Sequence, residues 1–362
     1  MKRYAFKTAI LVIALAMVSC LGDIPMKIEF NMTPEALNDG WEIAAPEDVG
    51  LDRARLEKAY DKFFSDKIFN TAYSLLVVRN GKLVAEGYRR GLDDRERLNN
   101  IKSSTKSVTS MLTGIAIDEG LIGAVQDKVY DYLPESFDND PLKREISIHH
   151  LLTMTSGLKW DNGVDNADWL VNEPADSLKH FLSRPMEYGP GDKFEYSDLN
   201  PHVMGGILAK ATGMKLSEYG RKKLFEPLGI KDYFWEEYGP DGLSFGAFGL
   251  YLKPRDFARI GLLAARYGQW EGKQIVPRRW MIESTQPMVN KNEGGYGYYW
   301  WVRPDYDAFA ALGHGGNHAY ILPNQDMVVI LTANPYTNWD MVSIKAKGME
   351  TLIYEILGAL TK

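Results

Sequence analysis

Cysteine is almost absent from the 362-residue chain, and Cys20 is its single occurrence. A lone thiol excludes an internal disulfide and the paired thiolates of a zinc or iron–sulfur site. Positive charge is not in excess: 42 Lys and Arg face 48 Asp and Glu, so the chain has no overall attraction for nucleic-acid phosphates. Nucleotide-binding glycine fingerprints and the H-E-x-x-H zinc motif are also missing. We therefore expect no metal, no cofactor and no nucleic-acid partner.

Long apolar runs are equally scarce, and the run at the N-terminus is short. Ala9–Val18 follows three basic residues and is about half of the ~20 residues that span a bilayer, which is typical of a secretory signal peptide. Small residues directly before Cys20 resemble a bacterial lipobox, in which the thiol is lipidated and the chain is cut before it. We therefore expect a signal peptide over residues 1–19 and an exported lipoprotein, periplasmic or in the cell envelope, that a lipid on Cys20 anchors to a bacterial membrane. The alternative is an ordinary secretory signal with an incidental cysteine.

The chain after Cys20 divides into two parts. Residues 20–48 are polar and contain three prolines, which predicts a lipid-anchored linker. Residues 49–358 contain no repeat, charge block or low-complexity segment. Roughly 310 residues exceed what one hydrophobic core usually serves, so we expect one folded body of two closely packed parts.

Hydrophobic periodicity predicts an α+β fold. Leu51–Phe64 has a helical period, and residues 103–229 are mostly helical segments. Two β-rich runs are joined by Asn80-Gly81, a strong hairpin signal. The remaining expected elements are strands at Tyr73–Arg79, Lys82–Tyr88, Gly297–Val302, Ala319–Leu322 and Met327–Thr332, and a helix from Asp340 to Leu357. This order predicts one antiparallel sheet with helices at both ends and a mainly helical insertion over about 103–250.

Three short motifs contain a serine in a pattern that nucleophilic enzymes use. Gly242–Gly246 matches G-x-S-x-G, but the apolar strand that this motif requires does not precede it. Ser156–Lys159 matches S-x-x-K but runs into a turn-prone stretch, so no helix sets its lysine against its serine. Ser103–Lys106 opens a run of apolar residues at helical spacing, which puts Lys106 one turn from the Ser103 hydroxyl. A simple helix N-cap is the alternative for Ser103.

Two further segments follow Ser103–Lys106 in chain order: Tyr196-Ser197-Asp198 and His314-Gly315-Gly316-Asn317. Together, the three segments resemble the S-x-x-K, Y-x-N and K-T-G elements of the serine penicillin-recognising, β-lactamase-related hydrolase superfamily. The likeness is closest to class C β-lactamases, family VIII carboxylesterases and 6-aminohexanoate-dimer hydrolases. It runs from about residue 50 to 355 and implies a β-lactamase/transpeptidase-like fold. Tyr336-Thr337-Asn338 also fits Y-x-N, but it lies in the wrong chain order.

The chemistry of the three residue types agrees with this resemblance. A serine hydroxyl needs a base within hydrogen-bond reach, yet free lysine and tyrosine hold their protons at neutral pH. In a partly desolvated cleft the two groups titrate as a pair. We therefore predict that Lys106 and Tyr196 together remove the proton of Ser103, and that an acyl-enzyme forms there. Tyr196 then shuttles the proton to the leaving group or activates water. Which of the two accepts the proton stays open.

The glycine segment is expected to close the site. Glycines in a strand let the backbone approach a ligand, so Gly315 and Gly316 are candidate substrate-binding residues. By resemblance, the main-chain N–H groups of Ser103 and Asn317 form the oxyanion hole, in which losing a donor typically costs about 10²–10³ in rate.

Two residues depart from the family pattern, and both are candidate substrate-binding residues. His314 stands where the K-T-G lysine would be, and Asp198 stands where Y-x-N has asparagine. Both changes remove positive or donor character from the cleft. We therefore expect substrates that lack a strong anionic handle or carry a cation.

The sequence thus predicts an exported serine hydrolase that acts on a small ester, amide or peptide-like molecule in preference to a β-lactam. The alternatives are a peptidoglycan D,D-peptidase or class C-like β-lactamase, and a non-catalytic binding lipoprotein of the same fold.

Overall fold

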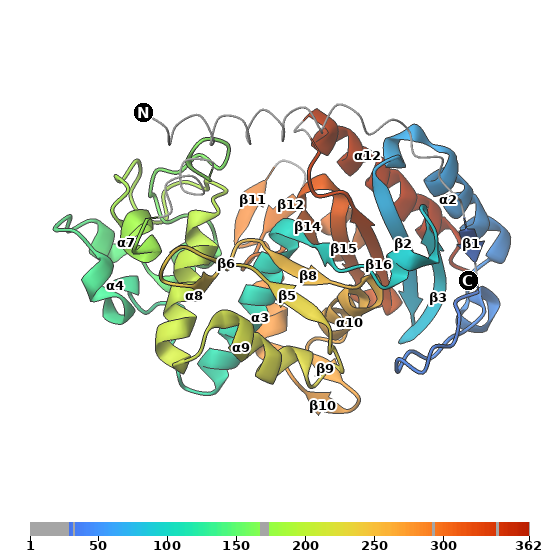
Figure 1. Ribbon diagram of the computed structural model, residues 1–362, viewed down its shortest axis with the longest axis horizontal. Coiled ribbons are helices and arrows are strands. Elements are labelled where there is room, and N and C mark those ends of the chain that lie inside the picture. Colours follow the sequence, from blue (N-terminus) through green and yellow to red (C-terminus); the bar gives the residue numbers. More distant parts are fainter. Residues whose placement is uncertain (1–28, 32, 167–173, 292–293, 338–339, 362) are drawn as a thin grey trace, which may run out of the picture.

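The structure is a computed structural model that describes residues 29–31, 33–166, 174–291, 294–337 and 340–361. The predicted signal peptide and Cys20 lie outside the described residues. Within the described ranges, one antiparallel sheet of nine strands occupies one half of the molecule, and mainly helical segments form the other (Figure 1). In sheet order the strands are β1 (Glu29–Asn31), β3 (Lys82–Tyr88), β2 (Ala72–Arg79), β16 (Met327–Ala333), β15 (Asn317–Leu322), β14 (Ala308–Gly313), β13 (Trp301–Arg303), β12 (Gly294–Tyr296) and β11 (Val289–Lys291).

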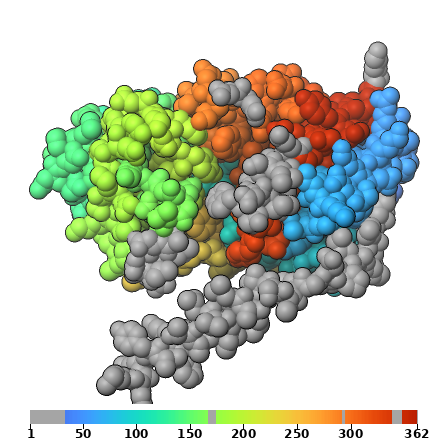
Figure 2. Space-filling view, turned by 90° about the horizontal axis from the view of Figure 1, so that it is seen from above, coloured from blue at the N-terminus to red at the C-terminus, as the bar shows by residue number. Residues whose placement is uncertain are grey.

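Strands from both ends of the chain pair within this sheet. β2 and β3 meet at Asn80-Gly81, whose φ values of 51° and 76° are those of a type I′ hairpin turn. β2 also pairs with β16 in antiparallel register. The N-terminal and C-terminal segments therefore lie side by side, as the blue and red surfaces in Figure 2 show. The predicted antiparallel sheet is confirmed.

Alternate side chains of the sheet enter two separate cores. Leu75 and Val77 pack with α2 (Arg53–Ser65) and α12 (Asp340–Gly358), the two predicted terminal helices. Leu76 and Val78 pack on the opposite face with α10 (Pro254–Ala265). This two-residue period is what a strand buried on both faces produces. The sheet is therefore a layer between terminal helices on one face and the remaining helices on the other.

The predicted helical insertion is α-helical only in part. In the part of it that the structure describes, the α-helices are α3 (Thr105–Asp118), α4 (Val129–Tyr132), α5 (Ile148–Leu152), α7 (Ser177–Leu182), α8 (Leu199–Thr212) and α9 (Leu216–Gly220). Three small sheets lie in and around this insertion. One has three strands, β4 (Asn99–Asn100), β8 (Leu250–Leu252) and β5 (Tyr233–Trp235). The other two have two strands each: β6 (Glu237–Tyr238) with β7 (Leu243–Ser244), and β9 (Gln269–Trp270) with β10 (Lys273–Gln274). α11 (Arg278–Ser284) leads back to the large sheet. Among the described residues, no helix is both long and apolar enough to cross a bilayer.

The predicted strand over Gly297–Val302 is right only at its end, because Trp301 and Val302 begin β13 whereas the residues before them form a turn. A turn separates β12 from β13, and in it the Gly297 N–H donates to the Trp300 carbonyl at 2.9 Å while Tyr299 adopts a φ of 63°. Because a turn does not alternate its side chains, successive aromatic rings enter the core together. The buried rings of this turn are those of Tyr298, Tyr299 and Trp300.

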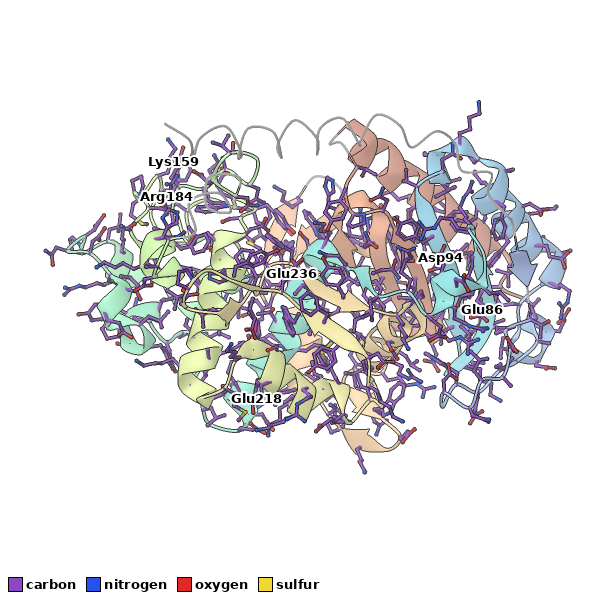
Figure 3. All side chains as sticks on the ribbon, in the orientation of Figure 1. Glu86, Asp94, Lys159, Arg184, Glu218 and Glu236 are labelled. Atoms are coloured by element: carbon purple, nitrogen blue, oxygen red, sulfur yellow. The ribbon has the colours of Figure 1, made fainter. Side chains whose placement is uncertain are left out.

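The predicted linker over residues 20–48 is too long. β1 pairs with β3, and the Asp39 carboxylate accepts a hydrogen bond from the Arg255 guanidinium at 2.8 Å. Arg255 also binds buried Glu86 through two hydrogen bonds of 2.6 and 2.9 Å (Glu86 is labelled in Figure 3). Buried charges require such partners, so this segment belongs to the folded body.

Candidate active site

Ser103 lies at the entrance to helix α3. It belongs to a short 3₁₀ turn, η4 (Lys102–Ser104), that continues directly into α3. The apolar side chains along α3 are buried, which fixes the helix and the turn before it. The Ser103 hydroxyl makes no helix cap, because α3 begins at Thr105 without a side-chain cap. The N-cap alternative is therefore not observed.

The lysine of the motif is held by three acceptors. Lys106 Nζ donates to Ser103 Oγ at 2.9 Å, to Asp198 Oδ1 at 2.5 Å and to the Ala247 carbonyl at 3.0 Å. The Lys106 side chain is only 1% exposed. A lysine ammonium has three N–H donors, so this arrangement satisfies all of them.

Asp198 lies directly before α8 and is 6% exposed. Its Oδ2 accepts a hydrogen bond from Asn166 Nδ2 at 2.7 Å, while Oδ1 binds Lys106. Its main-chain N–H donates to Asn162 Oδ1 at 2.8 Å. Asp198 lines the active-site cavity as expected, but both of its carboxylate oxygens already have protein partners.

Electrostatics favour the charged form of Lys106. Burial lowers the pKa of this ammonium, but the Asp198 carboxylate, with a smaller contribution from Tyr196, outweighs burial and raises the pKa above its ordinary value. Lys106 is therefore an ammonium at neutral pH. The asparagine that Y-x-N has at this position would be uncharged, so it could not compensate the Lys106 ammonium as Asp198 does.

Tyr196 completes the group. Lys106 Nζ lies 5.0 Å from the centroid of its ring. The ring stacks on Trp301 at a centroid distance of 5.6 Å and meets the edge of Tyr296 at 6.1 Å. These aromatic contacts fix the ring from two sides. The structure therefore brings together Ser103, Lys106 and Tyr196, which are far apart in the sequence.

A cavity of about 640 Å³ opens over these residues. Ser103, Tyr196 and Asp198 lie in its wall, together with residues at the end of the β14–β15 hairpin. Glu236 also lines it, and Figure 3 shows this residue near the middle of the molecule, between the helical half and the sheet. The cavity is large enough for a small organic substrate.

The glycine segment forms the tip of the β14–β15 hairpin. His314 and Gly316 line the cavity, whereas Gly315 and Asn317 do not. His314 Nε2 donates to the Thr337 carbonyl at 2.7 Å, so one ring nitrogen is engaged by the protein. Gly315 and Gly316 have φ values of 81° and 102°, which a side chain at either position would strain.

The side chain of Asn317 is structural. Its Nδ2 donates to the His314 carbonyl at 3.1 Å, and its Oδ1 accepts from the Ala333 N–H at 3.0 Å. These bonds tie the hairpin tip to β16. The oxyanion-hole role of the Asn317 N–H stays a prediction.

The other serine motifs lie outside this site. Lys159 is exposed and distant from Glu236 (Figure 3), and no helix connects it to Ser156. Ser244 lies in the two-residue strand β7, where its hydroxyl accepts a hydrogen bond from the Ser217 N–H at 3.1 Å. No strand-to-helix elbow is formed there. In the described ranges, no three His, Cys, Asp or Glu side chains group to hold a metal.

Several cavity residues were not identified from the sequence. Tyr336 and Thr337, set aside as a motif in the wrong order, form part of the wall, while Asn338 lies outside the described residues. Lys102 is marked in the sequence only by its place before Ser103. The other unanticipated wall residues are Asn162, Asn166, Glu236, Tyr238, Phe248, Leu312, His318 and Pro335.

Comparisons with known proteins agree with this geometry. The family model "Beta-lactamase" matches residues 70–347. Esterase EstB of Burkholderia gladioli is 29% identical over 209 residues, which cover 49% of this chain and 50% of the esterase. A Salmonella enteritidis protein described as a candidate D-alanyl-D-alanine carboxypeptidase is 26% identical over 215 residues, 52% of this chain and 49% of that protein. The chain thus spans about half the length of these two relatives.

A solved structure extends the likeness to almost the whole fold. A Bacillus anthracis protein described as a candidate 6-aminohexanoate-dimer hydrolase has a TM-score of 0.72 at 19% identity and covers 93% of this chain and 92% of its own. At this identity the likeness shows the fold alone. Because the family model matches far more than half of the sequence, the chain belongs to the Beta-lactamase family of serine hydrolases.

Proposed function

We propose that this protein cleaves ester or amide bonds through an acyl-enzyme on Ser103. The observation that carries the proposal is the 2.9 Å contact between Lys106 Nζ and Ser103 Oγ on the wall of the cavity. A nucleophile with a positioned proton-transfer partner is the signature of covalent catalysis. The esterase relative supports ester substrates, and the carboxypeptidase relative supports amides.

Because Lys106 is charged, Lys106 and Tyr196 have different roles in removing the proton of Ser103. As an ammonium held by Asp198, Lys106 is a donor to Ser103 Oγ and has no free lone pair to accept a proton. The proton of Ser103 therefore passes to Tyr196. Lys106 stabilises the anionic forms of both neighbours by its charge.

The reaction then proceeds in two balanced steps. Tyr196 reacts as the phenolate, which accepts the Ser103 proton while Oγ forms a bond to the carbonyl carbon. The bond to the leaving oxygen or nitrogen then breaks, and Tyr196 returns the proton to that atom and is again a phenolate. Water then attacks the ester on Ser103, with Tyr196 accepting its proton and passing it to Oγ. Developing negative charge lies near the N-terminus of α3, where the helix dipole is favourable.

Replacing Asp198 by asparagine tests the assignment of roles. In Asp198→Asn, the larger of the two contributions that oppose the burial of Lys106 is lost and only that of Tyr196 remains, so the pKa of Lys106 falls and the ammonium is lost at lower pH. We expect the alkaline limb of kcat/KM to move down by about one pH unit or more. A pH–rate profile measures this shift, with Asp131→Asn, an exposed carboxylate on α4, as the matched control. If Lys106 were the base, the same change would instead raise activity near neutral pH.

A substrate panel tests the function. We expect short-chain p-nitrophenyl esters to be hydrolysed with a higher kcat/KM than nitrocefin, because the family lysine is replaced by His314 in this cavity. A higher value for nitrocefin would favour the β-lactamase alternative, and release of D-alanine from a D-alanyl-D-alanine peptide at the highest rate would favour the D,D-peptidase. Absence of turnover on the entire panel would favour a non-catalytic binding protein.

We also propose that the protein is exported and lipid-anchored through Cys20, on the sequence pattern alone. Cys20→Ser should move the protein from the membrane fraction to the soluble fraction of the producing cells. An unchanged distribution would contradict the anchor.

A further inference from the structure

A second lysine lies in the active-site cavity, directly before the nucleophile. Lys102 has a φ of 50°, in the left-handed region that non-glycine residues seldom adopt. Its N–H donates to Asn100 Oδ1 at 2.9 Å, which holds this backbone conformation. The side chain lines the same cavity as Ser103.

The ammonium of Lys102 lies against aromatic rings. Its Nζ is 4.6 Å from the ring centroid of Tyr336 and 5.9 Å from that of Phe248. No hydrogen bond or salt bridge joins it to the residues that the structure describes. Burial lowers the pKa of Lys102, opposed at longer range by Glu236 and Asp198. A partly desolvated cation with unused donors is costly until an acceptor arrives.

The two carboxylates of the cavity are engaged elsewhere. Asp198 binds Lys106 and Asn166 through its two oxygens. Glu236 accepts hydrogen bonds from the hydroxyls of Tyr238 and Tyr251, the latter at 2.7 Å. Lys102 is therefore the cavity cation whose donors point to no described protein acceptor.

We infer that Lys102 is a specificity-determining residue that binds a carboxylate carried by the substrate. This inference rests on the proposed hydrolase function and names its substrate class: esters or amides with a carboxylate within reach of the scissile carbonyl. The rings of Tyr336 and Phe248 provide an apolar wall for the spacer between the two groups. His314 does not supply a fixed positive charge, and Lys102 thus provides one from the nucleophile side of the cavity. This inference revises the sequence-based expectation that substrates lack a strong anionic handle or carry a cation.

A matched substrate pair isolates this contact. Mono-p-nitrophenyl glutarate carries a free carboxylate, whereas its methyl ester has the same chain with that charge removed; succinate and adipate pairs vary the reach. The readout is the ratio of the two kcat/KM values after subtraction of spontaneous hydrolysis. Any general effect of a substitution beside Ser103 cancels in this ratio.

For the wild type, the free carboxylate should be preferred, and Lys102→Met should lower the ratio by about 10- to 100-fold, mainly through KM, as expected for a charge-assisted hydrogen bond. Lys102→Arg should recover most of the preference, and Lys273→Met, on exposed β10, should leave it unchanged. A wild-type ratio near one in all three pairs, or an unchanged ratio in Lys102→Met, overturns the inference alone. Failure to hydrolyse any member, together with unreactive Ser103, overturns the proposed function as well.

Discussion

Ser103→Ala should lower kcat/KM for p-nitrophenyl esters by about 10⁴-fold or more, because the Lys106–Tyr196 pair is left without a nucleophile. Steady-state kinetics measure the loss. Ser103 lies in a turn at the cavity wall, so removal of its hydroxyl should leave the fold intact, which thermal unfolding monitors. Residual activity close to that of the wild type would mean that the reaction takes place at another group.

The chain supplies matched controls for this substitution. Ser156 and Ser244 occupy the two competing motifs, and neither hydroxyl lies in the active-site cavity. Ser156→Ala and Ser244→Ala should therefore keep kcat/KM within about threefold of the wild type. A large loss of activity in either variant, together with an active Ser103→Ala, would show that the mechanism assigns the nucleophile to the wrong serine.

Lys106→Met should lower kcat/KM by about 10³-fold, because the ammonium that stabilises the anionic forms of Ser103 and Tyr196 is lost. The same change leaves the Asp198 carboxylate buried beside an apolar chain, so the free energy of unfolding should also fall, by about 3 kcal/mol. Kinetics and denaturant unfolding measure the two effects separately.

A double variant separates catalysis from stability. Lys106→Met with Asp198→Asn removes both charges of the buried pair and leaves no uncompensated ion. It should recover most of the lost stability, but none of the lost rate. Recovery of the rate together with stability would show that Lys106 acts only in folding.

The parts of the fold that depend on local signals were predictable from the sequence. Asn80-Gly81 specified a two-residue hairpin, and the period of Leu51–Phe64 specified the helix observed as α2. The strand expected over Gly297–Val302 begins only at Trp301, because the residues before it form a turn with a left-handed Tyr299, which the aromatic composition did not indicate. Residues 29–48 read as a linker because their partners lie far along the chain, in β3 for β1 and at Arg255 for Asp39.

In the active site, too, the features with local sequence signals were predictable and those that depend on distant residues were not. The spacing of Ser103 and Lys106 on one helix is local and was predicted, and their meeting with Tyr196 was inferred from the family resemblance. The ion pair between Lys106 and Asp198 joins residues 92 positions apart, so no periodicity reports it. Lys102 lines the cavity with a backbone φ of 50°, which its residue type does not indicate.

Covalent labelling tests the central claim most directly. The wild-type protein is treated with a fluorophosphonate, and the modified peptide is identified by mass spectrometry. We expect a single adduct on Ser103, formed much more slowly in Lys106→Met with Asp198→Asn. An adduct on another serine, or no adduct in an active wild-type preparation, would contradict nucleophilic catalysis by Ser103.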